Sequence, residues 1–130
     1  PEMIAMVLER EAKNRRSDDE LMKEAKEILG KLLPDFELTE QPKSITWRSM
    51  RERWGSCTTV DKTIRISDRL NSAPSYVLRH VIFHELIHLR IPDHGEDFQK
   101  LLSRDPDGVR AESFLEGFEL GSSGNSDIYL

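Results

Sequence analysis

The 130-residue chain has one cysteine, Cys57, and no uninterrupted apolar run of 18 residues. A single cysteine excludes internal disulfide bonds and is typical of a reducing compartment. Without a long apolar run there is no candidate transmembrane helix, and the apolar stretch at residues 3–8 is too short for a signal peptide. We therefore expect a cytoplasmic protein that does not enter a membrane.

Net positive charge is also missing, because 19 basic residues stand against 24 acidic ones, giving a net charge of −5. This balance argues against a general nucleic-acid-binding protein. The segment 43–69 is nevertheless basic, with three acidic residues against seven basic ones: Lys43, Arg48, Arg51, Arg53, Lys62, Arg65 and Arg69. The segment could contact a polyanion, although the solvated outer faces of strands explain the same pattern more simply.

No internal repeat divides the chain, and its length predicts one domain over residues 1–120. We expect a helical N-terminal part (1–43), a core of strands and metal-binding residues (44–104), and a flexible Gly/Ser-rich tail (121–130). One helix is predicted over residues 2–16, and a capping box of Ser17 and Glu20 predicts the start of another, which ends near Pro34.

The middle of the chain alternates apolar and polar residues, as half-buried strands do. Ile45 and Trp47 belong to one predicted strand, and Ile64 and Ile66 to another. A further strand within 53–59 would connect to 63–67 through a turn. Helices, then strands, then helices predict an α+β domain.

The motif that carries chemistry is His84-Glu85-Leu86-Ile87-His88, followed by His94. A chain of this composition would contain about 0.01 such His-Glu-x-x-His matches by chance. Two histidines four residues apart point to the same side of a helix and can bind one metal ion. His94 can add a third ligand and leave a position open for water, while Glu85 stands beside the metal as a base.

The motif lies in a stretch, residues 74–91, that is apolar on nearly every side and predicts a buried helix. His80 precedes His84 by one turn, but we expect it to be a core or supporting residue because a fourth imidazole would fill the water position. After Pro92, Asp93 and Glu96 predict the N-cap and third position of a short helix that returns His94 to the metal.

Together with this motif, three further features resemble the sequence pattern of the YgjP-like metal-dependent hydrolases. They are the run Arg53-Trp54-Gly55-Ser56-Cys57, the strand around Ile64, and the pair His94 and Phe98. These are relatives of the WLM and SprT-like peptidases in the zincin class. The resemblance implies a short twisted sheet over an active-site helix, one Zn²⁺ per chain held by the three histidines, and Glu85 as general base. Some relatives act on proteins bound to DNA, which would give the basic 43–69 segment a role.

Two departures narrow the resemblance. Ile91 replaces the glycine of the metzincin spacing, and all four methionines lie upstream of the histidines, so no Met-turn can follow them. A single cysteine also excludes the cysteine zinc ribbon of SprT-like proteins within this chain.

We therefore predict a monomeric zinc metallopeptidase that hydrolyses peptide or protein substrates through a metal-activated water. Thr63 and Arg65 would bind substrate if the strand 63–67 forms the sheet edge beside the metal. Candidate oxyanion stabilisers are Tyr76, Arg51 and Arg53.

Three alternatives stay open. The first is a YbeY-type endoribonuclease, which shares the histidine spacing but has glycine in place of Glu85. The second is a site in which Cys57 also binds the metal, as in peptide deformylases, although a small strand residue is the simpler interpretation. The third is a non-catalytic, metal-stabilised module that binds nucleic acid or protein.

Overall fold

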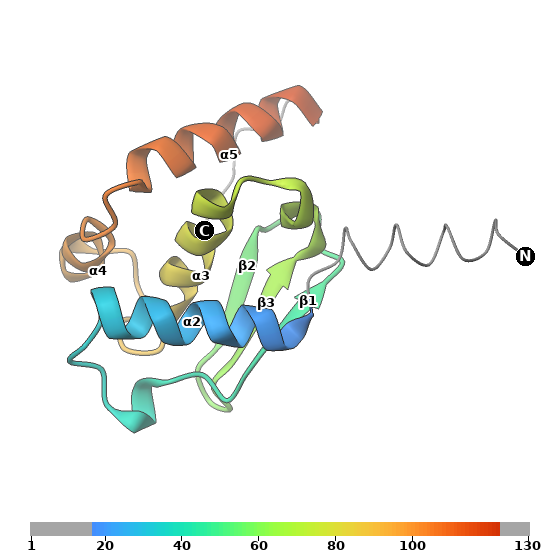
Figure 1. Cartoon of the computed structure of the whole chain (residues 1–130). Coiled ribbons are helices and arrows are strands. Elements are labelled where there is room, and N and C mark those ends of the chain that lie inside the picture. The colour runs from blue at the N-terminus through green and yellow to red at the C-terminus, as the bar shows by residue number, and fades with distance from the viewer. Residues whose placement is uncertain (1–16, 123–130) are drawn as a thin grey trace, which may run out of the picture.

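The computed structural model describes residues 17–122 (Figure 1). The helix predicted over 2–16 lies outside them, as does most of the predicted tail. Along the chain the elements are α2 (Asp18–Leu32), η1 (Leu38–Glu40), β1 (Ser44–Arg48), β2 (Gly55–Thr58), β3 (Thr63–Ser67), η2 (Asp68–Ser72), α3 (Ser75–Ile87), α4 (Glu96–Leu102) and α5 (Gly108–Ser122). This α+β arrangement confirms the predicted fold class.

Helix α3 is the centre of the fold, because it contacts α2, α4 and α5 as well as strands β2 and β3 (Figure 1). Ten of its thirteen residues are buried. The alternating residues Ile45, Trp47, Ile64 and Ile66 are buried in the same core. A helix that is covered on all sides must be apolar nearly all round, as the sequence predicts.

The order of strands in the sheet is β1-β3-β2, with β1 parallel and β2 antiparallel to β3. The prediction that strand 63–67 forms the edge beside the metal is therefore wrong: β3 is central, and β2 forms that edge. Apolar–polar alternation looks the same on a central strand as on an edge strand, so it could not reveal the order of strands.

The predicted helix boundaries hold in part. Ser17 is the N-cap of α2, and its Oγ accepts a hydrogen bond from the Glu20 N–H at 3.2 Å. Helix α3 ends at Ile87 rather than Ile91, because beyond Ile87 the last turn tightens: the Leu89 and Arg90 N–H groups donate three residues back, to the Leu86 and Ile87 carbonyl oxygens at 3.1 and 2.9 Å. The N-cap of α4 is Gly95 rather than Asp93, whose Oδ1 instead accepts a hydrogen bond from the Gly95 N–H at 2.8 Å.

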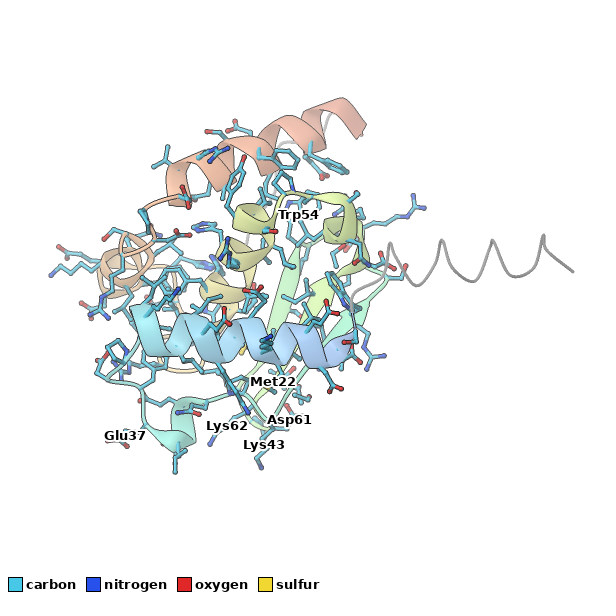
Figure 2. The ribbon with its side chains drawn as sticks, viewed as in Figure 1. Met22, Glu37, Lys43, Trp54, Asp61 and Lys62 are labelled. Atoms are coloured by element: carbon cyan, nitrogen blue, oxygen red, sulfur yellow. The ribbon has the colours of Figure 1, made fainter. Side chains whose placement is uncertain are left out.

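Helix α5 continues to Ser122, two residues into the predicted tail. It packs over Trp54 (Figure 2). The Trp54 ring meets that of Phe118 edge-on with centroids 5.4 Å apart, and the Arg69 guanidinium lies on the same indole. Trp47 and Trp54 are both buried, as expected of core residues. Among the described helices, none combines the length and apolarity that crossing a membrane requires.

Candidate metal centre

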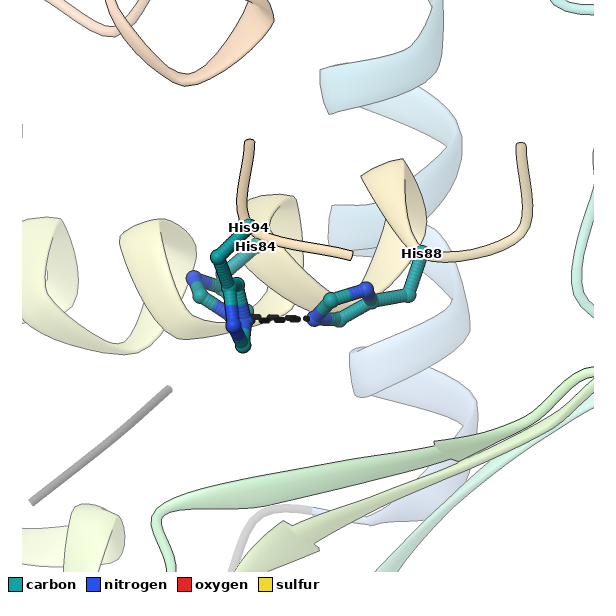
Figure 3. Close-up of side chains that lie close together, drawn as sticks. All are labelled: His84, His88 and His94. Carbon is teal, nitrogen blue, oxygen red and sulfur yellow. Dashed lines mark hydrogen bonds between the residues drawn. The ribbon is translucent and has the colours of Figure 1, made fainter. Parts of the chain in front are cut away.

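Helix α3 supplies two of the three histidines and the glutamate. His84 and Glu85 are buried, with 4% and 2% of their surfaces exposed, and His88 caps the C-terminal end of the helix. The chain then turns through residues 88–94, which returns His94 to the same place (Figure 3). The helix and this turn together explain why residues six and ten positions apart converge.

The three imidazoles meet through their Nε2 atoms (Figure 3). The His84 and His88 nitrogens are 3.2 Å apart, those of His84 and His94 are 3.2 Å apart, and those of His88 and His94 are 3.0 Å apart. Among the residues 17–122, this is the group of histidine, cysteine and acidic side chains whose ligand atoms are close enough to hold one ion.

The orientation of His88 fits metal binding. Its Nδ1 lies 3.0 Å from the Ile91 carbonyl oxygen, which can only accept a hydrogen bond, so Nδ1 carries the proton and Nε2 presents a lone pair to the other rings. Burial lowers the pKa of His88, and His94 adds to this, whereas the hydrogen bond to Ile91 opposes it. A neutral imidazole is the form that binds a metal.

The spacing of the nitrogens also fits a metal. Tetrahedral zinc with bonds of about 2.0–2.1 Å places its ligand nitrogens about 3.3 Å apart, close to the separations between these three rings. Three imidazoles suit Zn²⁺ and also Cu, Fe or Ni ions, so the donor set favours a transition metal without identifying it.

Glu85 lies beside this cluster in a close contact with the first residue of β2. A Cβ atom on Gly55 would be 3.0 Å from Glu85 Cγ and 3.1 Å from its Oε2. Burial raises the pKa of Glu85 to about 8, and the positive charge of Arg53 partly opposes this rise. Within the described part of the chain, Glu85 Oε2 is buried without a hydrogen-bond partner. Such an atom costs free energy unless a ligand or water meets it.

A cleft of about 460 Å³ opens beside the histidines and the glutamate. Strand β2 and the loop before it form one wall, and α3 and the turn after it form the other. The residues that line it are Glu52, Arg53, Gly55, Ser56, Cys57, Thr59, Glu85, His88, Pro92 and His94. An exposed sheet edge beside a metal-binding cluster can hold an extended chain.

Of the three candidate oxyanion stabilisers, only Arg53 lines this cleft. Arg51 is exposed, and its carbonyl oxygen accepts a hydrogen bond from Arg69. Tyr76 stacks under the guanidinium of Arg110 and borders a different cavity, between α2 and α3. The positions of Arg51 and Tyr76 therefore do not support a role at the metal.

The predicted substrate residues Thr63 and Arg65 lie on β3, away from the lining of the cleft. Arg65 donates hydrogen bonds to Ser56 Oγ at 3.2 Å and to Thr58 Oγ1 at 3.0 Å, and Thr63 Oγ1 donates to Asp61 at 2.7 Å. Both side chains alternate with the buried isoleucines and so face the outer side of the sheet. They stabilise the sheet rather than border the cleft.

The other two side chains considered as metal ligands, Cys57 and His80, lie outside the histidine cluster. Cys57 lines the cleft but is not part of the histidine cluster. Burial and the nearby Glu85 raise the pKa of its thiol to about 12, which disfavours the thiolate that binds metals. His80 is fully buried, and its Nδ1 lies 2.8 Å from Asp105 Oδ2, so it is a core residue as expected.

The basic residues of segment 43–69 do not gather on one surface. Figure 2 places Lys43 and Lys62 near the β2–β3 turn, away from Trp54, where Arg69 pairs with Glu119 at 3.3 Å. The Lys43 N–H donates to the Lys62 carbonyl oxygen at 2.8 Å, which brings these two lysines together. An association with DNA stays a prediction of the family resemblance and the basic segment.

Two residues around the site were not assigned a role from the sequence. Gly55 belongs to the run Arg53–Cys57, and a glycine inside a strand indicates a close approach of another group. Phe98 follows His94 by one helical turn and is fully buried. Its four-residue spacing from His94, a candidate ligand, is the sequence signal that points to it.

A family model described as "YgjP-like, metallopeptidase domain" matches residues 4–115. Two solved structures share the fold. The metallopeptidase zymogen abylysin of Pyrococcus abyssi has a TM-score of 0.58 and 18% identity, over 82% of this chain and 95% of that one. The metallopeptidase zymogen jannalysin of Methanocaldococcus jannaschii has a TM-score of 0.53 and 21% identity, over 78% of this chain and 97% of that one. No curated protein sequence matches the chain.

Proposed function

The chain belongs to the YgjP-like metallopeptidase family, and we propose that it is a zinc-dependent peptidase with Glu85 as general base. The family supports metal-dependent peptide hydrolysis in general. The choice of zinc and the role of Glu85 are our proposal, and the geometry of the site supports them. The observation that carries them is the convergence of three Nε2 atoms beside a buried carboxylate at the edge of a cleft.

His84, His88 and His94 would hold one Zn²⁺ per chain. Bound there, zinc supplies Lewis acidity, which lowers the pKa of a coordinated water to about 7 and polarises a carbonyl group. Two ligands lie on the packed helix α3, and the hydrogen bond to Ile91 fixes the ring of the second. A rigid ligand set of this kind favours a defined coordination geometry.

Glu85 would take a proton from the attacking water and pass it to the leaving amine. Its carboxylate is enclosed between α3 and β2 and lines the same cleft as His88 and His94, which places it within reach of a water bound at the three histidines. Arg53, at the same cleft, is the remaining candidate for stabilising the developing oxyanion.

A peptide would lie along β2, because its outer edge borders the cleft and β3 occupies its other side. Backbone hydrogen bonds to an edge strand hold a peptide without requiring one sequence. Thr63 and Arg65 have no part in this arrangement. A cytoplasmic location, a monomeric state and DNA-associated substrates stay predictions of the sequence.

The test is Glu85→Gln, which keeps the shape of the side chain but removes the base. We expect Zn²⁺ to stay bound while hydrolysis of casein falls by about 10²–10⁴-fold. Glu52→Gln is the matched control, because Glu52 also lines the cleft but is exposed, so its loss should be much smaller. Unchanged proteolysis by a zinc-loaded Glu85→Gln protein would contradict the proposal.

The same preparation separates the alternatives. Cleavage of labelled RNA but not of casein would favour the endoribonuclease, and binding without any cleavage would favour the non-catalytic module. Cobalt substitution tests Cys57, since a thiolate ligand adds a charge-transfer band that three imidazoles cannot give. We expect no such band.

A further inference from the structure

Phe98 contacts all three histidines of the cluster. Its ring centroid lies 4.7 Å from that of His84, 4.8 Å from that of His88 and 4.9 Å from that of His94. The ring meets His84 and His94 edge-on, and it is tilted by 31° to His88. One side chain therefore packs against every proposed ligand.

Phe98 lies on the inner side of the cluster. Its side chain is fully buried, whereas His88 and His94 line the open cleft. The imidazoles are thus held between solvent on one side and a flat apolar ring on the other. An apolar surface behind metal ligands limits their rotation and excludes water from the inner side of the site.

The position of Phe98 in the chain links it to the third ligand. His94 is exposed and lies just before α4, so its place depends on how α4 docks on α3. Phe98 follows it by one helical turn and inserts beneath the two histidines of α3. The Gln99 side chain donates a hydrogen bond to the His94 carbonyl oxygen at 3.3 Å from the same helix. Docking of Phe98 therefore brings His94 to His84 and His88.

We propose that Phe98 is a positioning residue that sets the three imidazoles in metal-binding geometry, and this rests on the proposed metal site. Phe98 reaches all three imidazoles from α4, the helix that follows His94. It does not touch the reacting atoms, so its effect must appear in metal affinity and ligand geometry.

The test compares Phe98→Leu with Phe83→Leu. Phe83 is a matched control, because it is equally buried but borders the other cavity, between α2 and α3. Both variants lose a buried ring, and thermal melting of the metal-free proteins measures the common structural cost. We expect Phe98→Leu to weaken Zn²⁺ binding by about 10–100-fold in chelator competition, with Phe83→Leu within about threefold of the parent.

The Co²⁺ spectrum supplies a readout that lost stability alone would not change. The d–d absorption should shift and weaken in Phe98→Leu but not in Phe83→Leu, because only the former frees the rings. Phe98→Met restores a large polarizable side chain and should recover most of the affinity.

The possible outcomes separate the two claims. A parent protein that binds neither Zn²⁺ nor Co²⁺ at these histidines would refute the metal site itself. A parent that binds both, with equal affinity and spectrum in the two leucine variants, would refute the role of Phe98 and leave the metal site standing.

Discussion

Replacing Gly55 by alanine should slow hydrolysis while leaving the metal in place. The new Cβ would lie 3.0 Å from Glu85 Cγ, 3.1 Å from its Oε2 and 3.2 Å from Val81 Cγ1. Comfortable contacts between carbon atoms begin at about 3.5 Å, so neighbouring atoms must move by a few tenths of an ångström. Val81 lies on the fully buried side of α3, and Glu85 is the group with room to move, toward the cleft.

The size of the effect follows from this displacement. Overpacking a buried site costs about 1–3 kcal/mol of stability. A misplacement of about 1 Å can reduce the rate of a positioned reaction about 10²-fold. A shift of about half that size in the general base therefore predicts a loss of about tenfold in kcat, with little change in KM.

The assay measures kcat, KM and bound zinc for Gly55→Ala and for Gly30→Ala. Gly30 lies in α2 with no atom within 4 Å of an added Cβ, so alanine there should stabilise the helix by about 0.5–1 kcal/mol and leave kcat unchanged. If folded, zinc-loaded Gly55→Ala kept kcat within twofold of the parent, the contact with Glu85 would have no catalytic importance.

Two further predictions concern polar pairs away from the cleft. Hydrogen bonds from Arg90 lower the pKa of Glu40 to about 2. The ionised Glu40 should therefore stabilise the fold by about 1–2 kcal/mol, fully above pH 4.5 and progressively less as the pH falls toward 2. Glu40→Gln should flatten the acid denaturation curve in that range, and an unchanged curve would contradict this. Asp105→Ala removes the hydrogen-bond partner of the buried His80 Nδ1. The free energy of unfolding measured by urea titration should fall by about 1–3 kcal/mol, while kcat stays unchanged. An unchanged urea midpoint would show that the His80–Asp105 pair does not stabilise the fold.

The sequence predicted those features of the site that depend on local geometry. His84 and His88 share a helix face because they are four residues apart, and the apolar residues around them predict burial. The His94 spacing predicted its return, but not the path of the chain. Helix α3 stops at Ile87, with His88 as its C-cap in contact with the Ile91 carbonyl oxygen, and the apolar pattern of residues 74–91 does not mark this boundary.

Other features could not be derived from local pattern. Arg51 and Arg53 are equivalent in a sequence, but only Arg53 lines the cleft, because the path of the loop before β2 separates them. Tyr76 is different, since helix geometry already argued against it. It precedes His84 by eight residues, which is about 12 Å along the helix axis. A side chain at that distance could not reach the metal.

Gly55 lies on the edge strand of the sheet and also beside Glu85. Because β2 is the edge strand, a peptide bound along it would pair with the β2 backbone. The position of that backbone would then determine the distance between the peptide and the three histidines. Gly55 begins this strand and also contacts Glu85, so the same residue determines how closely the base approaches the strand. A side chain at this position would separate Glu85 from the strand along which we propose that a peptide binds. On that proposal, glycine at position 55 is what lets the buried Glu85 approach a bound peptide.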